Sequence, residues 1–221
     1  MEIIKPWLKT WWGKLIAIFL TIILIFIVAI GFYIYDSVKI AKKQTGIKLN
    51  GQQYSAATNN NYWLGSAKAT ITIVEFSDFA CPACKQSFPT IREMSLKYKN
   101  DIKFIWRDYP VVADYSALLA LAGRCAGEQG LFWPMHDKLF QNQGVSTANE
   151  LIALANQVGV DAARFKNCLT EQKYLSQIEQ DLTDGQKFGI TGTPTYFING
   201  YKIPGDIPRD TFIKIIEGLK N

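Results

Sequence analysis

The stretch ITIVEFSDFACPACKQSFPTIREMSLKY, from Ile71 to Tyr98, decides the fold that we expect for this chain. It opens with Ile71 to Phe76, which are mostly β-branched or aromatic and predict a short strand. From Lys85 to Tyr98 apolar residues recur among charged ones at helical spacing, which predicts a helix. A second strand is predicted from Ile102 to Trp106. The motif Cys81-Pro82-Ala83-Cys84 therefore lies between a strand and a helix, in a strand–helix–strand unit.

This position suits thiol–disulfide exchange, because the attacking species is a thiolate. The free N–H groups and the positive dipole end of a helix stabilise an anion and lower the pKa of a thiol placed there. We expect Cys81 to be the exposed nucleophile and Cys84, one turn inside the helix, to be the buried resolving thiol. Pro82 suits the first helical position, since it has no N–H to leave unpaired.

A zinc site is the alternative interpretation of a CxxC motif. A structural zinc ion needs four ligands, and a second CxxC motif or histidine pair is missing. Cys125 and Cys168 are 43 residues apart and His136 is the only histidine. We therefore predict neither a metal nor an organic cofactor.

The C-terminal part of the chain predicts a β-hairpin and a closing helix. In the segment Ile190 to Ile198 an apolar strand follows Pro194, Asn199-Gly200 is a two-residue turn and Tyr201 to Ile203 is the returning strand. Thr211 to Leu219 is amphipathic. Pro194 stands where a strand begins, and either a cis Thr193–Pro194 bond at a tight turn or a trans proline on an edge strand accounts for it.

Between these halves the sequence predicts several helices, punctuated by glycines. Their ranges are Ala113–Ala126, Leu131–Phe140, Thr147–Val158, Ala162–Leu169 and Glu171–Phe188. The predicted fold is α/β: a thioredoxin-like domain over residues 62–221 with an inserted helical subdomain at about 112–170. Cys125 and Cys168 each fall near the end of a predicted helix. We expect a structural disulfide between them, with two buried free thiols as the alternative.

The N-terminal part predicts a membrane anchor. Leu15 to Tyr35 is a run of 21 residues without a charge, and a helix with a rise of about 1.5 Å per residue spans a hydrocarbon core of roughly 30 Å at that length. Trp7, Trp11 and Trp12 precede its apolar centre and Tyr33 and Tyr35 follow it, as interfacial aromatic residues do. A buried core helix and a cleaved signal peptide are the alternatives to an uncleaved, single-pass anchor.

Residues 1–14 are then an N-terminal flank and residues 36–61 a flexible linker. Lysines stand on both sides of the anchor, and their count slightly opposes a cytoplasmic N-terminus. Stable disulfides belong outside the cytoplasm, so we expect the C-terminal domain to face the extracytoplasmic side of the cell membrane.

The net charge of +5 is confined to the N-terminal part. Residues 1–50 contain seven lysines and two acidic residues, and the rest of the chain contains 17 residues of each sign. The predicted domain is therefore neutral and has no electrostatic footprint for nucleic acid.

These motifs resemble those of the DsbA-like family of thiol–disulfide oxidoreductases, especially its membrane-anchored bacterial members. The resemblance covers Leu64 to the C-terminus and is carried by VEFSDFACPAC (Val74–Cys84), RCAGEQGLFWPMHDKLF (Arg124–Phe140) and GITGTPTYFING (Gly189–Gly200). It implies a thioredoxin fold with a helical insertion, unfolded exported proteins as thiol substrates, and recharging by a quinone-linked membrane partner such as DsbB or a VKOR-like protein.

The resemblance also implies roles for single residues. Pro194 resembles the family's cis-proline beside the disulfide, and Thr193 would offer backbone groups to an extended substrate, alongside Pro82 and Ala83 of the motif. Glu75 matches a buried acid thought to help proton transfer, with a solvated strand-end carboxylate as the alternative. The family's best-known oxidase carries histidine where this chain has Ala83, which should make Cys81 less acidic and the disulfide less oxidising.

The first hypothesis is thus a disulfide donor that works through Cys81 and Cys84. An extracytoplasmic reductase or isomerase would use the same residues, because redox direction depends on the stability of the reduced form. A non-catalytic, tethered metal- or client-binding module is the hypothesis of another class.

Overall fold

The computed structural model describes residues 11–43, 49, 51–58 and 60–220, which belong to two compact units, Met1–Gly46 and Ile47–Asn221. The first unit contains helix α1 (Trp11–Lys43). The strands of the second unit are β1 (Trp63–Gly65), β2 (Ile71–Ser77), β3 (Ile102–Asp108), β4 (Thr195–Ile198) and β5 (Tyr201–Pro204). Its helices are α2 (Pro82–Lys97), α3 (Ser116–Gly127), α4 (Phe132–Gln141), α5 (Ala148–Val158), α6 (Ala162–Thr170), α7 (Leu175–Lys187) and α8 (Arg209–Leu219).

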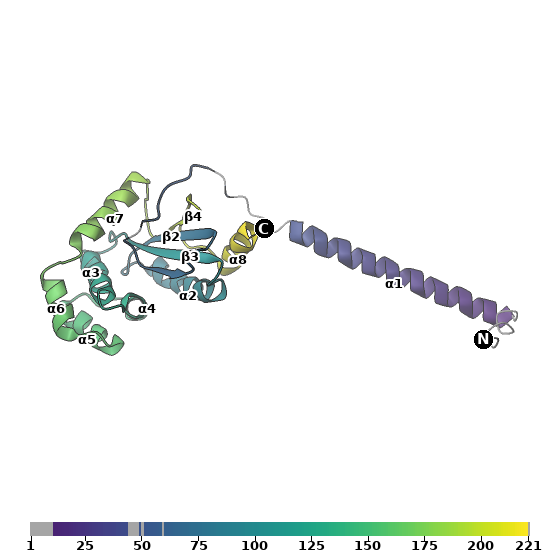
Figure 1. The fold of residues 1–221 in the computed structure, drawn as a ribbon, viewed down its shortest axis with the longest axis horizontal. Helices are drawn as coiled ribbons and strands as arrows, with labels where there is room; N and C mark the ends of the chain where they lie inside the picture. The colour runs from purple at the N-terminus through teal and green to yellow at the C-terminus, as the bar shows by residue number, and fades with distance from the viewer. Residues whose placement is uncertain (1–10, 44–48, 50, 59, 221) are drawn as a thin grey trace. The chain divides into compact units, whose positions relative to one another are not determined.

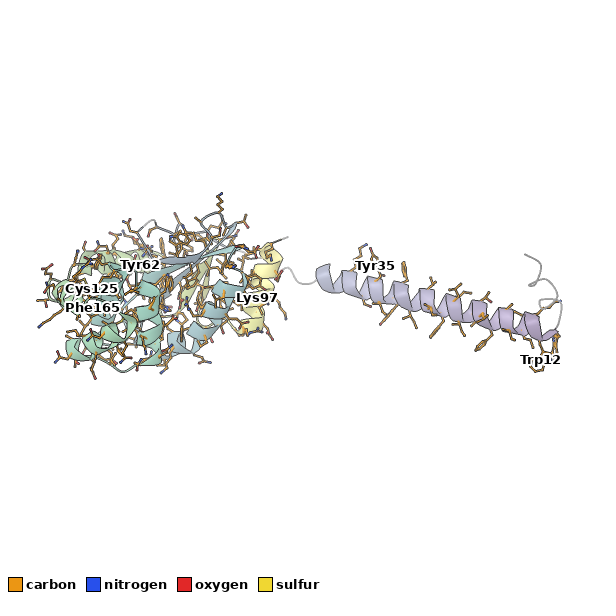
Figure 2. All side chains as sticks on the ribbon, turned by 60° about the horizontal axis from the view of Figure 1, so that its bottom comes forward. Trp12, Tyr35, Tyr62, Lys97, Cys125 and Phe165 are labelled. Carbon is orange, nitrogen blue, oxygen red and sulfur yellow. A yellow bond between two sulfur atoms is a disulfide. The ribbon has the colours of Figure 1, made fainter. Side chains whose placement is uncertain are left out.

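Helix α1 contains the predicted membrane segment and extends beyond it at both ends. The part from Trp11 to Ser37 is long and apolar enough to cross a membrane, and its most apolar window of 18 residues has no buried residue. Trp12 and Tyr35 lie near opposite ends of the helix (Figure 2). By length and composition, α1 is therefore a candidate membrane span.

The sheet of the second unit is mixed, with the strand order β1-β3-β2-β4-β5. The central strands β2 and β3 are parallel, and all other neighbouring strands are antiparallel. Because β2 and β3 need a crossover to run parallel, helix α2 connects them across one face of the sheet. This arrangement confirms the predicted α/β, thioredoxin-like fold.

The alternation of side chains along β2 separates two apolar layers. Ile71 and Ile73 face one layer, where buried residues of α2 and α8 such as Ile91 and Phe212 cover the sheet. Val74 and Phe76 face the other layer. Glu75 and Ser77 share the face of Ile73 and are therefore directed toward α2, which carries the two cysteines of the motif.

Helices α3 to α6 gather beyond one end of the central strands and enclose a third apolar cluster (Figure 1). They occupy the stretch in which the helical insertion was predicted. A disulfide joins Cys125 of α3 to Cys168 of α6, with 5.8 Å between their Cα atoms. Cys125 lies in this helical part, far from Lys97 at the end of α2 (Figure 2).

The N-terminal approach to the domain differs from the predicted flexible linker of residues 36–61. Helix α1 continues to Lys43, and the chain from Gln53 onward packs against the sheet. Tyr54 N–H donates to the Gly200 carbonyl at 2.9 Å, and its ring packs on Phe197. Ala56 is buried. The segment is polar in composition, but its apolar side chains pack against the sheet next to β5. Composition alone does not reveal this packing.

A buried charge network fixes this segment, β3, α3 and α7 to one another. Arg107 donates to the Ala56 carbonyl at 3.1 Å and to Asp181 at 2.8 Å. Arg124 donates to Asp108 at 2.5 Å and to the other oxygen of Asp181 at 2.6 Å. Each buried charge is paired and hydrogen-bonded, as burial requires.

Candidate active site

The two cysteines of the motif lie where β2 passes into α2. Cys81 is the N-cap residue of α2, with φ −76° and ψ 122°, and Pro82 is the first helical residue. Cys84 lies one turn later and is completely buried, whereas Cys81 retains 5% of its surface. Both thiols are free in this structure. The structure has one cysteine at the helix start and its partner inside the helix, but the expected exposure of Cys81 is wrong: Cys81 is buried, because the turn packs against the apolar cluster of the helical part.

Asp78 holds the turn that presents Cys81. Its Oδ1 accepts a hydrogen bond from Ala80 N–H at 2.8 Å. Its Oδ2 accepts from Val111 N–H and Val112 N–H, each at 2.8 Å, so the turn is fastened to the loop after β3. Cys81 N–H donates to the Asp78 carbonyl at 3.0 Å. This role of Asp78 was not predicted from the sequence, although an aspartate shortly before a helix start is a known signal for local backbone bonding.

Gln143, in the loop after α4, is a second residue that sequence analysis missed. Its side-chain amide donates to the carbonyls of Phe79 and Cys81, each at 2.9 Å. These bonds connect the helical part of the domain to the backbone of the turn from Phe79 to Cys81. Nothing in the local sequence around Gln143 signals a partner that lies 62 residues away.

The loop before β4 completes the surroundings of Cys81. The Thr193–Pro194 peptide bond is cis, which is one of the two forms that the sequence left open. Cys81 Sγ lies 3.3 Å from the Thr193 carbonyl oxygen and donates to it when the thiol is protonated. Cys81, Thr193 and Pro194 thus come together from opposite halves of the chain. Pro82 is exposed and Ala83 is half-buried; their roles in substrate binding stay predictions.

The two thiols differ in acidity for physical reasons visible in the structure. The pKa of Cys81 is lowered to about 6, mainly because the Cys84 thiol donates to its sulfur. The N–H groups of Ala83 and Cys84 lower it further, whereas burial opposes the shift. The pKa of Cys84 is raised, first by burial and then by its hydrogen bond to Cys81. Near neutral pH, Cys81 is therefore a thiolate and Cys84 a thiol.

Glu75, on the strand beneath the motif, is the third titratable group of the site after Cys81 and Cys84. It is 3% exposed, and burial raises its pKa to about 8. Tyr196 lies opposite it on β4 and donates to Glu75 Oε1 at 3.4 Å. The solvated carboxylate that the sequence allowed is thus excluded, and Glu75 is a protonated acid at pH 7.

His136 is not part of this arrangement. His136 is buried on α4 among aromatic rings, with Trp106 at 4.8 Å between ring centroids, and burial lowers its pKa. Within the described ranges, no group of three or more histidine, cysteine, aspartate or glutamate residues is arranged to hold a metal ion.

Comparison with known proteins gives a family and several relatives. A family model described as thioredoxin matches residues 57–218. The Na⁺/H⁺ antiporter NhaA 1 of Salinispora arenicola is 36% identical over 143 residues, which make up 64% of this chain and 22% of the antiporter. The chain therefore spans about a fifth of the length of the curated relatives it matches.

Two solved structures are similar over most of their length. The oxidised form of BdbD from Bacillus subtilis is 29% identical, with a TM-score of 0.66, and the alignment covers 78% of this chain and 98% of BdbD. DsbA2 from Pseudomonas aeruginosa is 25% identical, with a TM-score of 0.60, and the alignment covers 74% of this chain and 96% of DsbA2.

Proposed function

Because this chain belongs to the thioredoxin family and is a thiol–disulfide oxidoreductase of the DsbA type, we propose that it oxidises exported proteins through Cys81 and Cys84. In the proposed reaction, a substrate thiolate attacks Cys81 Sγ in the Cys81–Cys84 disulfide, and Cys84 leaves. A second substrate thiolate then attacks the substrate sulfur of this mixed disulfide. Cys81 leaves as a thiolate, the substrate gains a disulfide and the enzyme is left reduced.

The observation that carries this direction is the lowered pKa of Cys81, about 6. A stabilised thiolate favours the reduced enzyme, and an enzyme whose reduced form is stabilised is a stronger oxidant. Cys81 is also the better leaving group, since a thiol of low pKa leaves faster. A protein that reduces its substrates would instead need a reduced form that is less stabilised relative to its disulfide form.

Substrate contact is proposed at the rim of this site. The Thr193 backbone, Pro194, Pro82 and Ala83 surround Cys81 and would receive an extended segment of an unfolded protein. The catalytic acid would be Glu75, which is protonated at pH 7 and lies beneath Cys84. It would supply a proton to Cys84 when that sulfur leaves.

The reduction potential tests the direction. The full chain, in detergent, would be equilibrated against glutathione buffers, and the fraction of reduced Cys81 and Cys84 measured by alkylation. We expect a potential well above the roughly −270 mV of thioredoxin, toward the roughly −120 mV of strong oxidases. A value near that of thioredoxin would instead support a reductase and overturn the oxidase proposal.

The proposed location is the cell membrane, with α1 as a single-pass anchor and residues 62–221 as the redox domain on the extracytoplasmic side. The length and composition of α1 and the Cys125–Cys168 disulfide support this proposal. In such a location, a quinone-linked membrane protein of the DsbB or VKOR type would reoxidise Cys81 and Cys84.

Topology can be tested with a cysteine introduced at exposed Lys166, in a background in which Cys81 and Cys84 are replaced by serine. We expect a membrane-impermeant maleimide to label Lys166→Cys in intact cells. Labelling only after lysis would contradict the proposed orientation.

A further inference from the structure

The Ser77 hydroxyl is a buried polar group with no evident structural task. Ser77 is the last residue of β2 and is 1% exposed. Among the residues that the structure describes, its Oγ forms no hydrogen bond of ordinary geometry. Burying a hydroxyl without a partner costs free energy, so this position calls for an explanation other than stability.

Ser77 is near two titratable groups of the site, the Glu75 carboxyl group and the Cys84 thiol. It follows Glu75 by two residues in β2, so both side chains are directed to the same face of the sheet. That face is covered by α2, where Cys84 is completely buried. The strand thus places the hydroxyl beside the carboxyl group, and the helix brings the Cys84 sulfur over it.

The hydroxyl is close enough to both groups to affect each. Burial raises the pKa of Glu75 and that of Cys84, and in both cases the Ser77 hydroxyl opposes this rise by favouring the charged form. The N–H of the next residue, Asp78, also reaches the Cys84 sulfur. A serine hydroxyl can accept one hydrogen bond while it donates another, so a free hydroxyl between an acid and a thiol can pass a proton from one to the other.

We propose that Ser77 is a further catalytic residue, which relays the proton between the Glu75 carboxyl group and Cys84 Sγ. This inference rests on the proposed exchange at Cys81 and Cys84 and adds a participant to it. When Cys84 leaves during attack on the disulfide, its sulfur takes the Ser77 hydroxyl proton, and Ser77 takes the proton of Glu75. The sulfur–sulfur electron pair stays with Cys84, and Glu75 becomes a carboxylate.

The relay runs in reverse when Cys84 attacks a mixed disulfide at Cys81. The Cys84 proton passes to Ser77 Oγ as the Ser77 proton passes to the Glu75 carboxylate. The Cys84 sulfur uses its electron pair to form the bond to Cys81 Sγ, and the other sulfur of the mixed disulfide departs as a thiolate. Protons and electrons balance in both directions without a further reactant.

Neighbouring hydroxyl groups are less suited to this task. Ser87 Oγ donates to the Cys84 carbonyl oxygen at 3.1 Å and is thereby engaged. Tyr196 already donates to Glu75 at 3.4 Å, from the side of β4. The charged and titratable groups that act on Glu75 are Cys81, Cys84, Tyr196 and Asp206, and Asp206 is exposed.

The reverse step can be isolated with an aromatic disulfide reagent. Reduced full chain in detergent is mixed with dithiobis(nitrobenzoate), and the coloured thiolate is followed by stopped flow. The first equivalent reports attack by Cys81, and the second reports attack by Cys84 on the mixed disulfide. Only the second step requires removal of the Cys84 proton. Its rate in the wild-type chain should rise with pH up to about 8, where Glu75 is ionised.

For Ser77→Ala we expect the second release to slow roughly tenfold to a hundredfold near pH 7, within the usual range for general acid–base catalysis. The first release should stay unchanged. Ser95→Ala is the matched control, because Ser95 is also a buried serine, in α2, and its hydroxyl donates to the Ile91 carbonyl within the helix. Its two releases should both match those of the wild type.

A double variant separates a relay from a packing effect. In the Glu75→Gln background, Ser77→Ala should cause no further slowing, because the acceptor of the relay is already gone. An unchanged second release in Ser77→Ala, or equal slowing in both backgrounds, would overturn the relay. If Ser77→Ala does not fold, the comparison uses Ser77→Thr and Ser77→Gly, of which only the former should retain the fast second release. A wild-type chain that releases a single equivalent would overturn the proposed exchange itself.

Discussion

Gln143 Nε2 lies 2.9 Å from the carbonyl oxygen of Cys81, so an amide of the helical part supports the backbone of the nucleophile. The same nitrogen donates to the Phe79 carbonyl. The Cys81 carbonyl also accepts from Lys85 N–H at the start of α2, whereas the Phe79 carbonyl lies in a turn outside regular secondary structure and needs a partner from elsewhere. The helical part of the domain is therefore one of the structures that position Cys81.

We expect Gln143→Leu to lower the free energy of unfolding by roughly 1–3 kcal/mol, because the buried Phe79 carbonyl loses its donor and the Cys81 carbonyl keeps only the Lys85 N–H. Amide exchange in the turn from Phe79 to Cys81 should accelerate. Gln157→Leu, at an exposed position of α5, is the matched control and should change neither quantity. Unchanged exchange in Gln143→Leu would show that the turn does not depend on this amide.

The acidity of Cys81 should depend on its partner thiol. Removing the donor in Cys84→Ala should raise the pKa of Cys81 from about 6 by about one unit or more. Cys84→Ser keeps a donor and should raise it less. Ultraviolet thiolate absorbance, titrated between pH 4 and 10, measures both. A pKa near 6 in both variants would mean that the helix start alone, and not the Cys84 thiol, stabilises the thiolate.

Glu75 should make the stability of the reduced chain depend on pH. Its folded-state pKa, about 8, lies above the roughly 4.3 of an unfolded glutamate. Protonated Glu75 is favoured on folding, so its contribution is complete below about pH 4.3 and is lost as pH rises to about 8. The free energy of unfolding of Glu75→Gln should therefore equal that of the wild type near pH 4 and exceed it by a few kcal/mol near pH 8.

Urea unfolding of the reduced chain at several pH values measures this difference. Glu179→Gln, at an exposed position of α7, is the control. A difference between Glu75→Gln and the wild type that does not change with pH would contradict a buried, protonated Glu75.

The disulfide of the helical part should act on stability and not on exchange. Replacing Cys125 and Cys168 together by alanine should lower the free energy of unfolding by roughly 3–4 kcal/mol in the chain-entropy model. The reduction potential of Cys81 and Cys84 should stay the same, because the side chains that hydrogen-bond the turn before α2 belong to Asp78 and Gln143, which lie outside α3 and α6. A shifted potential would show that the helical part affects the redox site through this bond.

Elements with strong local signals were predictable from the sequence. The strand before Cys81, the helix after it and the hairpin at Asn199-Gly200 depend on periodicity and turn chemistry, which act over a few residues. The central strand β2 and helix α8 lie within two residues of their predicted bounds at each end. The longer predicted helix from Glu171 begins only at Leu175, because Gln172 has a positive φ of 49° and interrupts it.

Features that depend on distant partners were not predictable from local patterns. The strand β1 has three residues and is defined by pairing with β3. Asp78 and Gln143 acquire their roles from contacts with backbone groups far along the chain. Ser77 reads as an ordinary strand-end residue until α2 is packed over it. Glu75 could have been solvated, and only the three-dimensional packing shows that it is buried.

In the proposed direction of exchange, the Cys125–Cys168 disulfide makes each newly made chain a client of the mature chain. A nascent copy leaves synthesis with four reduced cysteines and needs an oxidant to close this bond. In the proposed direction, a mature copy can supply it in trans. Biogenesis would then be autocatalytic: the first molecules mature slowly, later ones mature faster, and the lag depends on how many finished copies a cell inherits from its mother.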